Sequence, residues 1–396
     1  MNDQTRLHRE KIAQARRYMA ERGIDAWLIR DRGTGDPCVP LMFGIQTVGD
    51  AVYLITGGAA TALVESRDAD AVNDSALFDQ VIVVGEETGA DSERAARLRT
   101  LLGAIAPTQI AVNVSAANHL ADGMTVGTYR SLLTMLGPEL SGRLVPSDEF
   151  LQRLRSIKTA EEVAYIRKAI AITLEIYDEV FAAIRVGMTE IEVGELFIEG
   201  MRKRGVVNGI TRSLTPPIVM KHKIAHRAPG PGVIEKGDYL IMDFSVDYCG
   251  YCSDIARTAY VLRDGETGPS DAMEAAFRTV REATDRALEV LKPGAIGRDV
   301  DHAARQYVLD HGYPNIFHSV GHQVGRDVHD GGTMLGPDRG GYRKDSLGTV
   351  EAGMVFAVEP TILYEEGPAI ISEDNYLVTD DGAELLGEPQ RNLVLI

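Results

Sequence analysis

The stretch that decides the fold lies at residues 239–258 and reads YLIMDFSVDYCGYCSDIART. It has the pattern of two strands joined by a turn, and we centre the turn between Tyr248 and Cys249. That register places Asp243 opposite Asp254. Carboxylates that face each other across a ladder destabilise a sheet, and the apolar run before Asp243 indicates that the first strand is buried. The hairpin therefore predicts a bound cation that removes the repulsion.

A second pair of acids occupies a similar position near the C-terminus. The segment VFAVEP contains Glu359, and the return segment AIISED contains Glu373. The turn-prone residues EEGP lie between the two segments. A hairpin centred on Glu366 places Glu359 opposite Glu373. The chain thus offers two hairpins, and each of them presents a facing pair of acids.

A histidine-rich segment, HSVGHQVGRDVHD at residues 318–330, lies between the two hairpins. Four carboxylates and one imidazole, that of His322, can neutralise two divalent cations. A single buried aspartate is usually a satisfied turn or cap residue, but five candidate ligands in this order are not expected by chance. Oxygen-rich ligation with one nitrogen suits Mn²⁺, Co²⁺, Fe²⁺ or Zn²⁺ and does not select among them. The predicted metal ligands are Asp243, Asp254, His322, Glu359 and Glu373.

The length of 396 residues favours two domains over a single core. Strand-like and helix-like segments alternate over residues 1–150, and this alternation predicts a compact α/β domain. Its expected strands lie at 26–30, 51–55, 61–65, 81–84 and 109–112, and its expected helices lie at 6–22, 92–103 and 125–136.

Residues 151–396 are expected to form an α+β catalytic domain in which strands mix with long helices. Thr159 and Glu162 fit a capping box at the start of one long helix, and Thr189 and Glu192 repeat the pattern at the next helix. Further helices are expected at 271–291 and 299–311. The expected strands lie at 214–220, 238–248, 252–262, 353–364 and 369–379.

The composition of the chain argues against several classes of function. A formal net charge of −17 repels phosphate backbones, so we expect no nucleic-acid partner. No apolar stretch is long enough to cross a membrane, and no apolar segment follows residues 1–6, so we expect neither a membrane span nor a secretory signal. Three cysteines do not make a disulfide framework, and we interpret the CxxC at 249–252 as coincidence. The expected class is a cytoplasmic enzyme.

These motifs resemble those of the pita-bread metallopeptidases, the superfamily of methionine aminopeptidase, aminopeptidase P and prolidase. The resemblance rests on the Asp-x10-Asp spacing with the ending GYxxDxxRT at 250–258, on GHxxGxxxH at 321–329, and on the last two motifs, VEP and ED. Residues 154–162 resemble the linker of the prolidase and aminopeptidase P branch. The likeness is strong over 150–380. It implies an α+β fold, in which a smaller creatinase-like α/β domain precedes a pita-bread catalytic domain, and it implies a homodimer.

The resemblance also implies a role for each predicted metal ligand. Asp243 would bind one of two divalent metal ions. Asp254 and Glu373 would bridge both ions. His322 and Glu359 would bind the second ion. Mn²⁺ is the first expectation, with Co²⁺, Zn²⁺ and Fe²⁺ as alternatives.

Several further residues match family positions around the substrate. His226 and His329 match two histidines beside the substrate, and His318 matches a third histidine of the prolidase-like branch. The expected catalytic residues are His226, His329 and Glu359, with Glu359 as the proton shuttle to the leaving nitrogen. The expected substrate-binding residues are His226, His318, His329 and Arg326.

The activity implied by the resemblance is hydrolysis of the peptide bond before proline, first of all in Xaa-Pro dipeptides. Family members often carry arginines at the positions of Ile371 and Thr333, where an arginine can bind a substrate carboxylate. Their absence leaves other candidates for that contact, namely Arg326, Arg227, Lys223 and Tyr342.

The absent arginines also keep two alternatives open. One is aminopeptidase P-like release of the N-terminal residue from longer Xaa-Pro peptides. The other is a metal-dependent non-peptidase on the same fold, either a small-amide hydrolase or a lyase. A metal-free relative is a weaker alternative, because such a protein is expected to have lost ligands and all five are present here.

Overall fold

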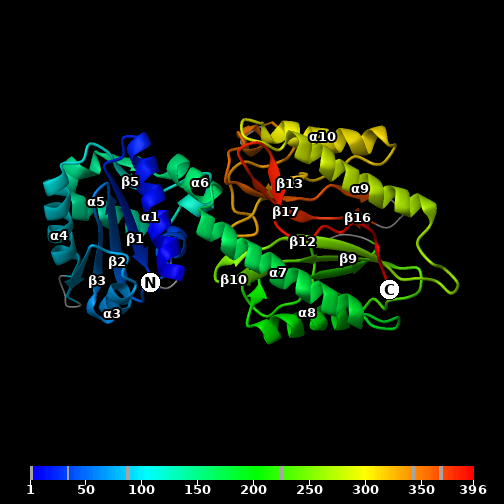
Figure 1. The fold of residues 1–396 in the computed structure, drawn as a ribbon. Helices are drawn as coiled ribbons and strands as arrows, with labels where there is room; N and C mark the ends of the chain where they lie inside the picture. The colour runs from blue at the N-terminus through cyan, green and yellow to red at the C-terminus, as the bar shows by residue number, and fades with distance from the viewer. Residues whose placement is uncertain (1–2, 34, 86–89, 223–225, 341–343, 365–368) are drawn as a thin grey trace. The chain divides into compact units, whose positions relative to one another are not determined.

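The computed structural model describes residues 3–33, 35–85, 90–222, 226–340, 344–364 and 369–396. The chain divides into two compact units, Met1–Arg155 and Ser156–Ile396 (Figure 1). The first unit holds an α/β sheet and the second mixes strands with long helices, which confirms the expected fold class. No helix of the described residues is long and apolar enough to cross a bilayer.

The first unit is built on a six-stranded sheet with the strand order β4-β3-β2-β1-β5-β6. At its centre, β1 runs antiparallel to β2 and parallel to β5. All five strands predicted for this part of the chain are present, and β6 is an addition. The strands are β1 (Ala26–Arg32), β2 (Asp50–Thr56), β3 (Ala60–Glu65), β4 (Gln80–Val84), β5 (Ile110–Val112) and β6 (Leu144–Pro146).

The helices of the first unit confirm the three that periodicity predicts and add three short ones. Leu98 of α4 and Leu132 of α5 pack with Leu28 and Val52 of the sheet in one buried cluster. The three additions have five to nine residues each, which is too short for an apolar stripe to repeat. The predicted helices are α1 (Asp3–Glu21), α4 (Ala90–Ile105) and α5 (Val126–Ser141), and the additions are α2 (Cys38–Met42), α3 (Ser66–Asp74) and α6 (Asp148–Ser156).

In the second unit, α7 (Ala160–Ala183) and α8 (Glu190–Arg204) flank one side of the strands (Figure 1). The helices α9 (Asp271–Val290) and α10 (Gly297–Asp310) flank the other side. Both predicted capping boxes are present at the starts of α7 and α8. In each box the threonine hydroxyl accepts from a backbone N–H, and the glutamate accepts from the threonine N–H.

The strands of the second unit form four small sheets, of which two have four strands each, in the orders β19-β12-β9-β8 and β13-β14-β17-β18. The strands are β7 (Val207–Asn208), β8 (Ile218–Lys221), β9 (Tyr239–Phe244), β10 (Val246–Tyr248), β11 (Tyr251–Cys252), β12 (Ile255–Tyr260), β13 (Gly321–Gln323), β14 (Val355–Val358), β15 (Thr361–Leu363), β16 (Ala369–Ile371), β17 (Asp374–Val378), β18 (Ala383–Leu385) and β19 (Val394–Leu395).

The register of the first hairpin differs from the prediction by two residues. Asp243 pairs with Ala256, and the turn is centred one residue later than expected because Tyr248 pairs with Tyr251. Asp254 lies between β11 and β12 and is not directly opposite Asp243. Side chains alternate with a period of two, so a two-residue shift keeps both carboxylates on one face as diagonal neighbours.

The register of the C-terminal hairpin confirms the prediction. Val358 pairs with Asp374 on one side of the acids, and Thr361 pairs with Ile371 on the other. Both pairs fit a hairpin centred on residue 366, so Glu359 and Glu373 come opposite each other between the two ladders. The predicted turn at 365–368 lies outside the described residues.

Candidate metal centre

The structure brings together acids and a histidine that are far apart in the sequence. Asp254, His322 and Glu373 are buried, and each offers a ligand atom within 4.8 Å of the others. His322 Nε2 lies 3.3 Å from Asp254 Oδ2 and 3.6 Å from Glu359 Oε1. Asp243 is electrostatically coupled to Asp254 and Glu359. All five predicted ligands therefore share one neighbourhood, which we call the ligand cluster.

Each member of the ligand cluster is held on a strand or at a strand end. Asp243 belongs to β9, and Asp254 immediately precedes β12. His322 is the middle residue of β13, whose partner strand β14 ends one residue before Glu359. Glu373 immediately precedes β17. Ladders thus hold the backbone of Asp243 and His322, and the other three candidate ligands directly adjoin a ladder strand.

Burial and mutual repulsion disfavour ionisation of the carboxylates in the ligand cluster. Burial raises the pKa of Asp243 and of Glu373 well above the usual range, and the charge of Asp254 raises both further. Burial also raises the pKa of Glu359 to about 7, although His322 opposes this shift. These three acids are therefore costly to ionise without an added cation.

The imidazole of His322 shows the complementary effect. Burial opposes its protonation, yet the hydrogen bond with Asp254 and the charges of Glu359 and Asp254 outweigh burial and raise the pKa of His322 to about 9. The proton on this ring supplies part of the positive charge that a metal ion would otherwise supply to Asp254 and Glu359. Metal binding needs a neutral imidazole, so an ion would displace that proton.

The donor set fits divalent metal ions. Within the part of the chain that the structure describes, no lysine or arginine forms an ion pair with any of the four carboxylates. Their ion-pair partners are His322 and, at 3.9 Å from Glu359, His318. Buried carboxylates are normally paired with cations or bound to metals. Four carboxylate groups and one imidazole match the oxygen-rich ligation of the Mn²⁺ class.

The three predicted substrate histidines lie around the ligand cluster. The ring of His329 lies 4.2 Å from that of His322. Burial lowers the pKa of His329, and His322 and His226 lower it further, which places His226 in the same electrostatic neighbourhood. His318 lies 2.6 Å from the carbonyl of Ser319 through Nδ1, which leaves Nε2 for another contact. Their roles toward a substrate stay a prediction.

Arg326 packs against an aromatic ring of the second unit. Its guanidinium carbon is 5.2 Å from the ring centre of Tyr251, on the hairpin formed by β10 and β11. A Cβ on Gly250 would clash with the same guanidinium, so glycine makes room for it there. This packing gives Arg326 a structural role that its place in the motif does not reveal. Its predicted contact with substrate is untested.

The other candidates for a substrate carboxylate also have structural positions. Arg227 pairs with Glu190 at 2.9 Å. At the two positions where family members often carry arginines, Ile371 is buried in β16 and Thr333 donates to the carbonyl of Thr349. Lys223 and Tyr342 lie outside the described residues.

Several residues support the ligand cluster from behind. Arg257, which the sequence predicts to pair with a nearby acid, pairs with Asp374 and donates to the carbonyl of Glu373. Sequence reasoning missed the others, of which Arg281 of α9 also pairs with Asp374. The Tyr177 hydroxyl lies 2.9 Å from two carbonyl oxygens, one in β9 and one in β12. Asn375 contacts the backbone of Asp254. Spacing in the sequence contains no signal for such contacts, because the partners are distant along the chain.

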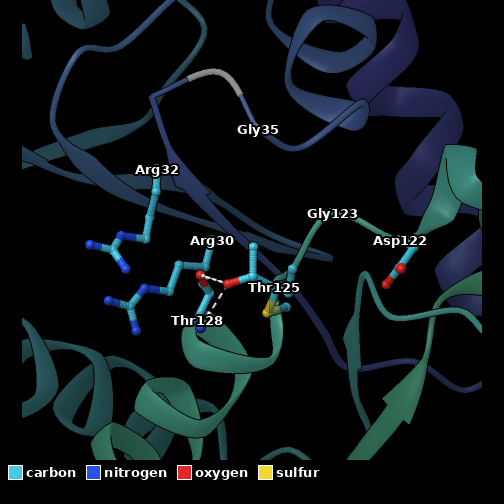
Figure 2. A pocket seen from close by; sticks show the side chains of 8 residues that line it. Arg30, Arg32, Gly35, Asp122, Gly123, Thr125 and Thr128 are labelled. Atoms are coloured by element: carbon cyan, nitrogen blue, oxygen red, sulfur yellow. Dashed lines mark hydrogen bonds between the residues drawn. The ribbon is translucent and has the colours of Figure 1, made fainter.

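A cavity of about 310 Å³ in the first unit is lined by none of the predicted site residues (Figure 2). Arg30 and Arg32 line it beside the start of α5, where the Thr125 hydroxyl caps the helix. The guanidinium of Arg30 donates to Ser131 and pairs with Asp50. Two arginines repel a divalent cation, so this cavity does not compete with the ligand cluster as a metal site.

Comparisons with known proteins identify the family of the chain. The family model "Metallopeptidase family M24" matches residues 164–380, more than half of the chain. The "Uncharacterized peptidase YqhT" of Bacillus subtilis is 27% identical over 389 residues, which cover 98% of this chain and 100% of that protein. The solved Xaa-Pro dipeptidase from Bacillus anthracis is 26% identical, with a TM-score of 0.77 over 98% of this chain and 100% of that one. The X-Pro aminopeptidase from Thermotoga maritima is 25% identical, with a TM-score of 0.76 over 96% and 100%.

The chain belongs to metallopeptidase family M24. It is a hydrolase that acts on peptides, and its catalytic region has the pita-bread fold that the motifs imply. The family implies a divalent metal ion, for which the buried trio of Asp254, His322 and Glu373 is a candidate site.

Proposed function

We propose that this metallopeptidase hydrolyses the peptide bond before proline in Xaa-Pro dipeptides, with two divalent metal ions, Mn²⁺ first. The ligand cluster carries the proposal, because it gathers four carboxylates without an arginine or lysine partner among the described residues. Asp254 and Glu373 are buried and Asp243 and Glu359 are partly buried, so the four groups call for more than one positive charge. The ions would be held by Asp243, Asp254, His322, Glu359 and Glu373.

A divalent ion at this site supplies polarisation of a carbonyl oxygen and activation of water at neutral pH. The protein's own groups would perform the remaining work. Glu359 faces both His318 and His322, so its carboxylate is positioned to carry a proton toward the leaving nitrogen. His329 and His226 would donate hydrogen bonds to the oxygen on which negative charge develops.

The choice of substrate rests on relatives and on the histidines. The names of two similar solved proteins, an Xaa-Pro dipeptidase and an X-Pro aminopeptidase, both point to a bond before proline. We place the dipeptide first and the longer peptide second, as the motifs of the prolidase branch suggest. A homodimer in the cytoplasm remains our expectation for the assembled enzyme.

A peptide panel tests the proposal. The purified protein is assayed on Ala-Pro, Ala-Pro-Ala and Ala-Ala, each with Mn²⁺, Co²⁺, Zn²⁺ or Fe²⁺, and the Asp254→Asn variant controls for contaminating peptidases. We expect cleavage of Ala-Pro by the wild type alone, with Mn²⁺ the best activator. Preference for Ala-Pro-Ala would favour the aminopeptidase P-like activity. Failure on both proline peptides, with metal bound, would favour a small-amide hydrolase or lyase.

A further inference from the structure

The side chain of Asn375 forms two hydrogen bonds with the backbone of one metal-ligand candidate. The amide N–H of Asp254 donates to Asn375 Oδ1 at 3.0 Å. Asn375 Nδ2 donates to the Asp254 carbonyl at 2.8 Å. The asparagine is 1% exposed, so water does not compete for these bonds. This reciprocal pair copies the pattern that a neighbouring strand would offer.

The position of Asp254 explains why a side chain is needed there. Asp254 falls in the gap between β11 and β12, where the described residues contain no ladder partner for it. Its backbone N–H and C=O would otherwise be buried without hydrogen-bond partners, which is unfavourable. The amide of Asn375 satisfies both groups and fixes the backbone that carries the Asp254 carboxylate.

The same asparagine stands two residues after Glu373, so it links two ligand candidates. Glu373 is tied to the same strand by its own N–H, which donates to the carbonyl of Ala256 at 3.1 Å. Arg257 donates to the Glu373 carbonyl at 2.7 Å. These hydrogen bonds join the chain segments around Asp254 and Glu373, and the two that involve Asn375 act directly on Asp254.

We propose that Asn375 is a positioning residue of the metal centre, which sets the separation between the Asp254 and Glu373 carboxylates. The inference rests on the proposed function, in which these two acids would help to hold the metal ions. Groups that orient a ligand without touching the ion typically contribute 10–100-fold to metal affinity. Asn375 would act in that way through the backbone of Asp254.

The chain offers a matched control in β12, the strand that follows Asp254. Gln390 forms an equivalent pair with Thr258 of β12. The Thr258 N–H donates to Gln390 Oε1 at 3.1 Å, and Gln390 Nε2 donates to the Thr258 carbonyl at 2.5 Å. Thr258 is not a ligand candidate. Loss of the two hydrogen bonds between Gln390 and Thr258 should therefore reduce folding stability without changing the geometry of the ligand cluster.

The experiment compares Asn375→Leu with Gln390→Leu in the full chain. Each metal-free protein is titrated with Mn²⁺ by calorimetry, and its thermal unfolding is measured in parallel. We expect Asn375→Leu to bind Mn²⁺ about 10–100-fold more weakly than the wild type. We expect Gln390→Leu to lose stability and keep wild-type affinity. If Asn375→Leu does not fold, Asn375→Ala replaces it, because alanine removes the same bonds with less bulk.

Equal Mn²⁺ affinity in the Asn375 variant and the wild type would overturn the inference, as would equal weakening by both variants. Peptide cleavage is not needed for either result. A wild type that binds Mn²⁺ but cleaves no Xaa-Pro peptide would overturn only the proposed substrate. A wild type that binds neither Mn²⁺ nor Co²⁺, Zn²⁺ or Fe²⁺ would overturn the metal centre and the inference together.

Discussion

Both units of the molecule bury charged side chains, but they neutralise them in different ways. In the first unit, Arg30 and Arg94 are each 1% exposed, and they pair with the acids Asp50, Glu65 and Asp91. In the second unit, the ion pairs of the four ligand-cluster carboxylates among the described residues are those of Asp254 and Glu359 with histidines, and none is with an arginine or lysine. In the first unit, Arg30 and Arg94 neutralise the acids, whereas the acids of the ligand cluster need metal ions from solution for the same purpose. A buried charge is therefore evidence for function only when its ion-pair partners within the protein are also known.

The largest expected effect comes from removing one carboxylate of the ligand cluster while keeping its shape. Glu359→Gln should lower kcat/KM on the best Xaa-Pro peptide by at least about 100-fold, or about 2.7 kcal/mol, because the amide is a poorer ligand and cannot carry a proton. Steady-state kinetics with saturating Mn²⁺ measure this loss.

The control for Glu359→Gln is Glu384→Gln, which changes an exposed glutamate that pairs with Arg167. It should leave the kinetics unchanged. An activity of Glu359→Gln within about tenfold of the wild type, a barrier change of only ~1.4 kcal/mol, would contradict the role of Glu359.

The ligand cluster could be predicted from the sequence because its members sit in short local motifs. The predicted register of the C-terminal hairpin was correct, since both ladders fit a turn centred on residue 366. The observed register of the first hairpin differs from the predicted one by two residues. Asp243 and Asp254 still share one face, because two residues are one full period of a strand. An error of one residue would have separated Asp243 from Asp254.

The support of the ligand cluster could not be predicted in the same way. Asn375 and Asp254 are 121 residues apart, and neither residue type nor spacing indicates that an amide would fill a gap in a ladder. The packing of the Arg326 guanidinium against Tyr251 had no signal in the sequence either, and the predicted contact of Arg326 with substrate stays a prediction. Long-range packing decides such contacts, and a single sequence contains little trace of it.

The next expected effect is on folding stability, and it follows because the carboxylates of the ligand cluster have no lysine or arginine partner among the described residues. An ion that binds only the folded state stabilises it by about 2.7 kcal/mol at 100 times its dissociation constant. Chelation should therefore lower the melting temperature of the wild type, and Mn²⁺ should restore it. Calorimetry of the metal-free and metal-loaded protein measures the change.

The double variant Asp254→Asn, Glu373→Gln sharpens this test. It removes two of the four carboxylates, so its melting temperature should respond weakly to Mn²⁺ and should exceed that of the metal-free wild type. The second expectation follows from the burial of Glu373, whose ionised form is costly when no cation is bound. A metal-free wild type as stable as the loaded protein would argue against an unbalanced cluster.

The smallest expected effect concerns the balanced group of the first unit. Arg30→Met leaves the carboxylate of Asp50 with a weaker set of partners, and breaking a fully buried ion pair costs about 3–5 kcal/mol. The loss here should be smaller, about 2 kcal/mol, because Asp50 is 22% and Asp91 60% exposed and water can solvate them. Removal of the arginine also relieves a burial cost, which lowers the pKa of Arg30 in the wild type.

Urea unfolding measures the change, with Arg167→Gln as the exposed comparison. Arg167 pairs with Glu384 at 2.7 Å, but both side chains are 40% or more exposed, so this variant should lose less than about 0.5 kcal/mol. Neither substitution should alter Mn²⁺ affinity, because both arginines serve the structure of their own unit. A change in Mn²⁺ affinity in Arg30→Met would show that the two charged groups are coupled, and the contrast between a self-balanced group and one that takes its cations from solution would then fail.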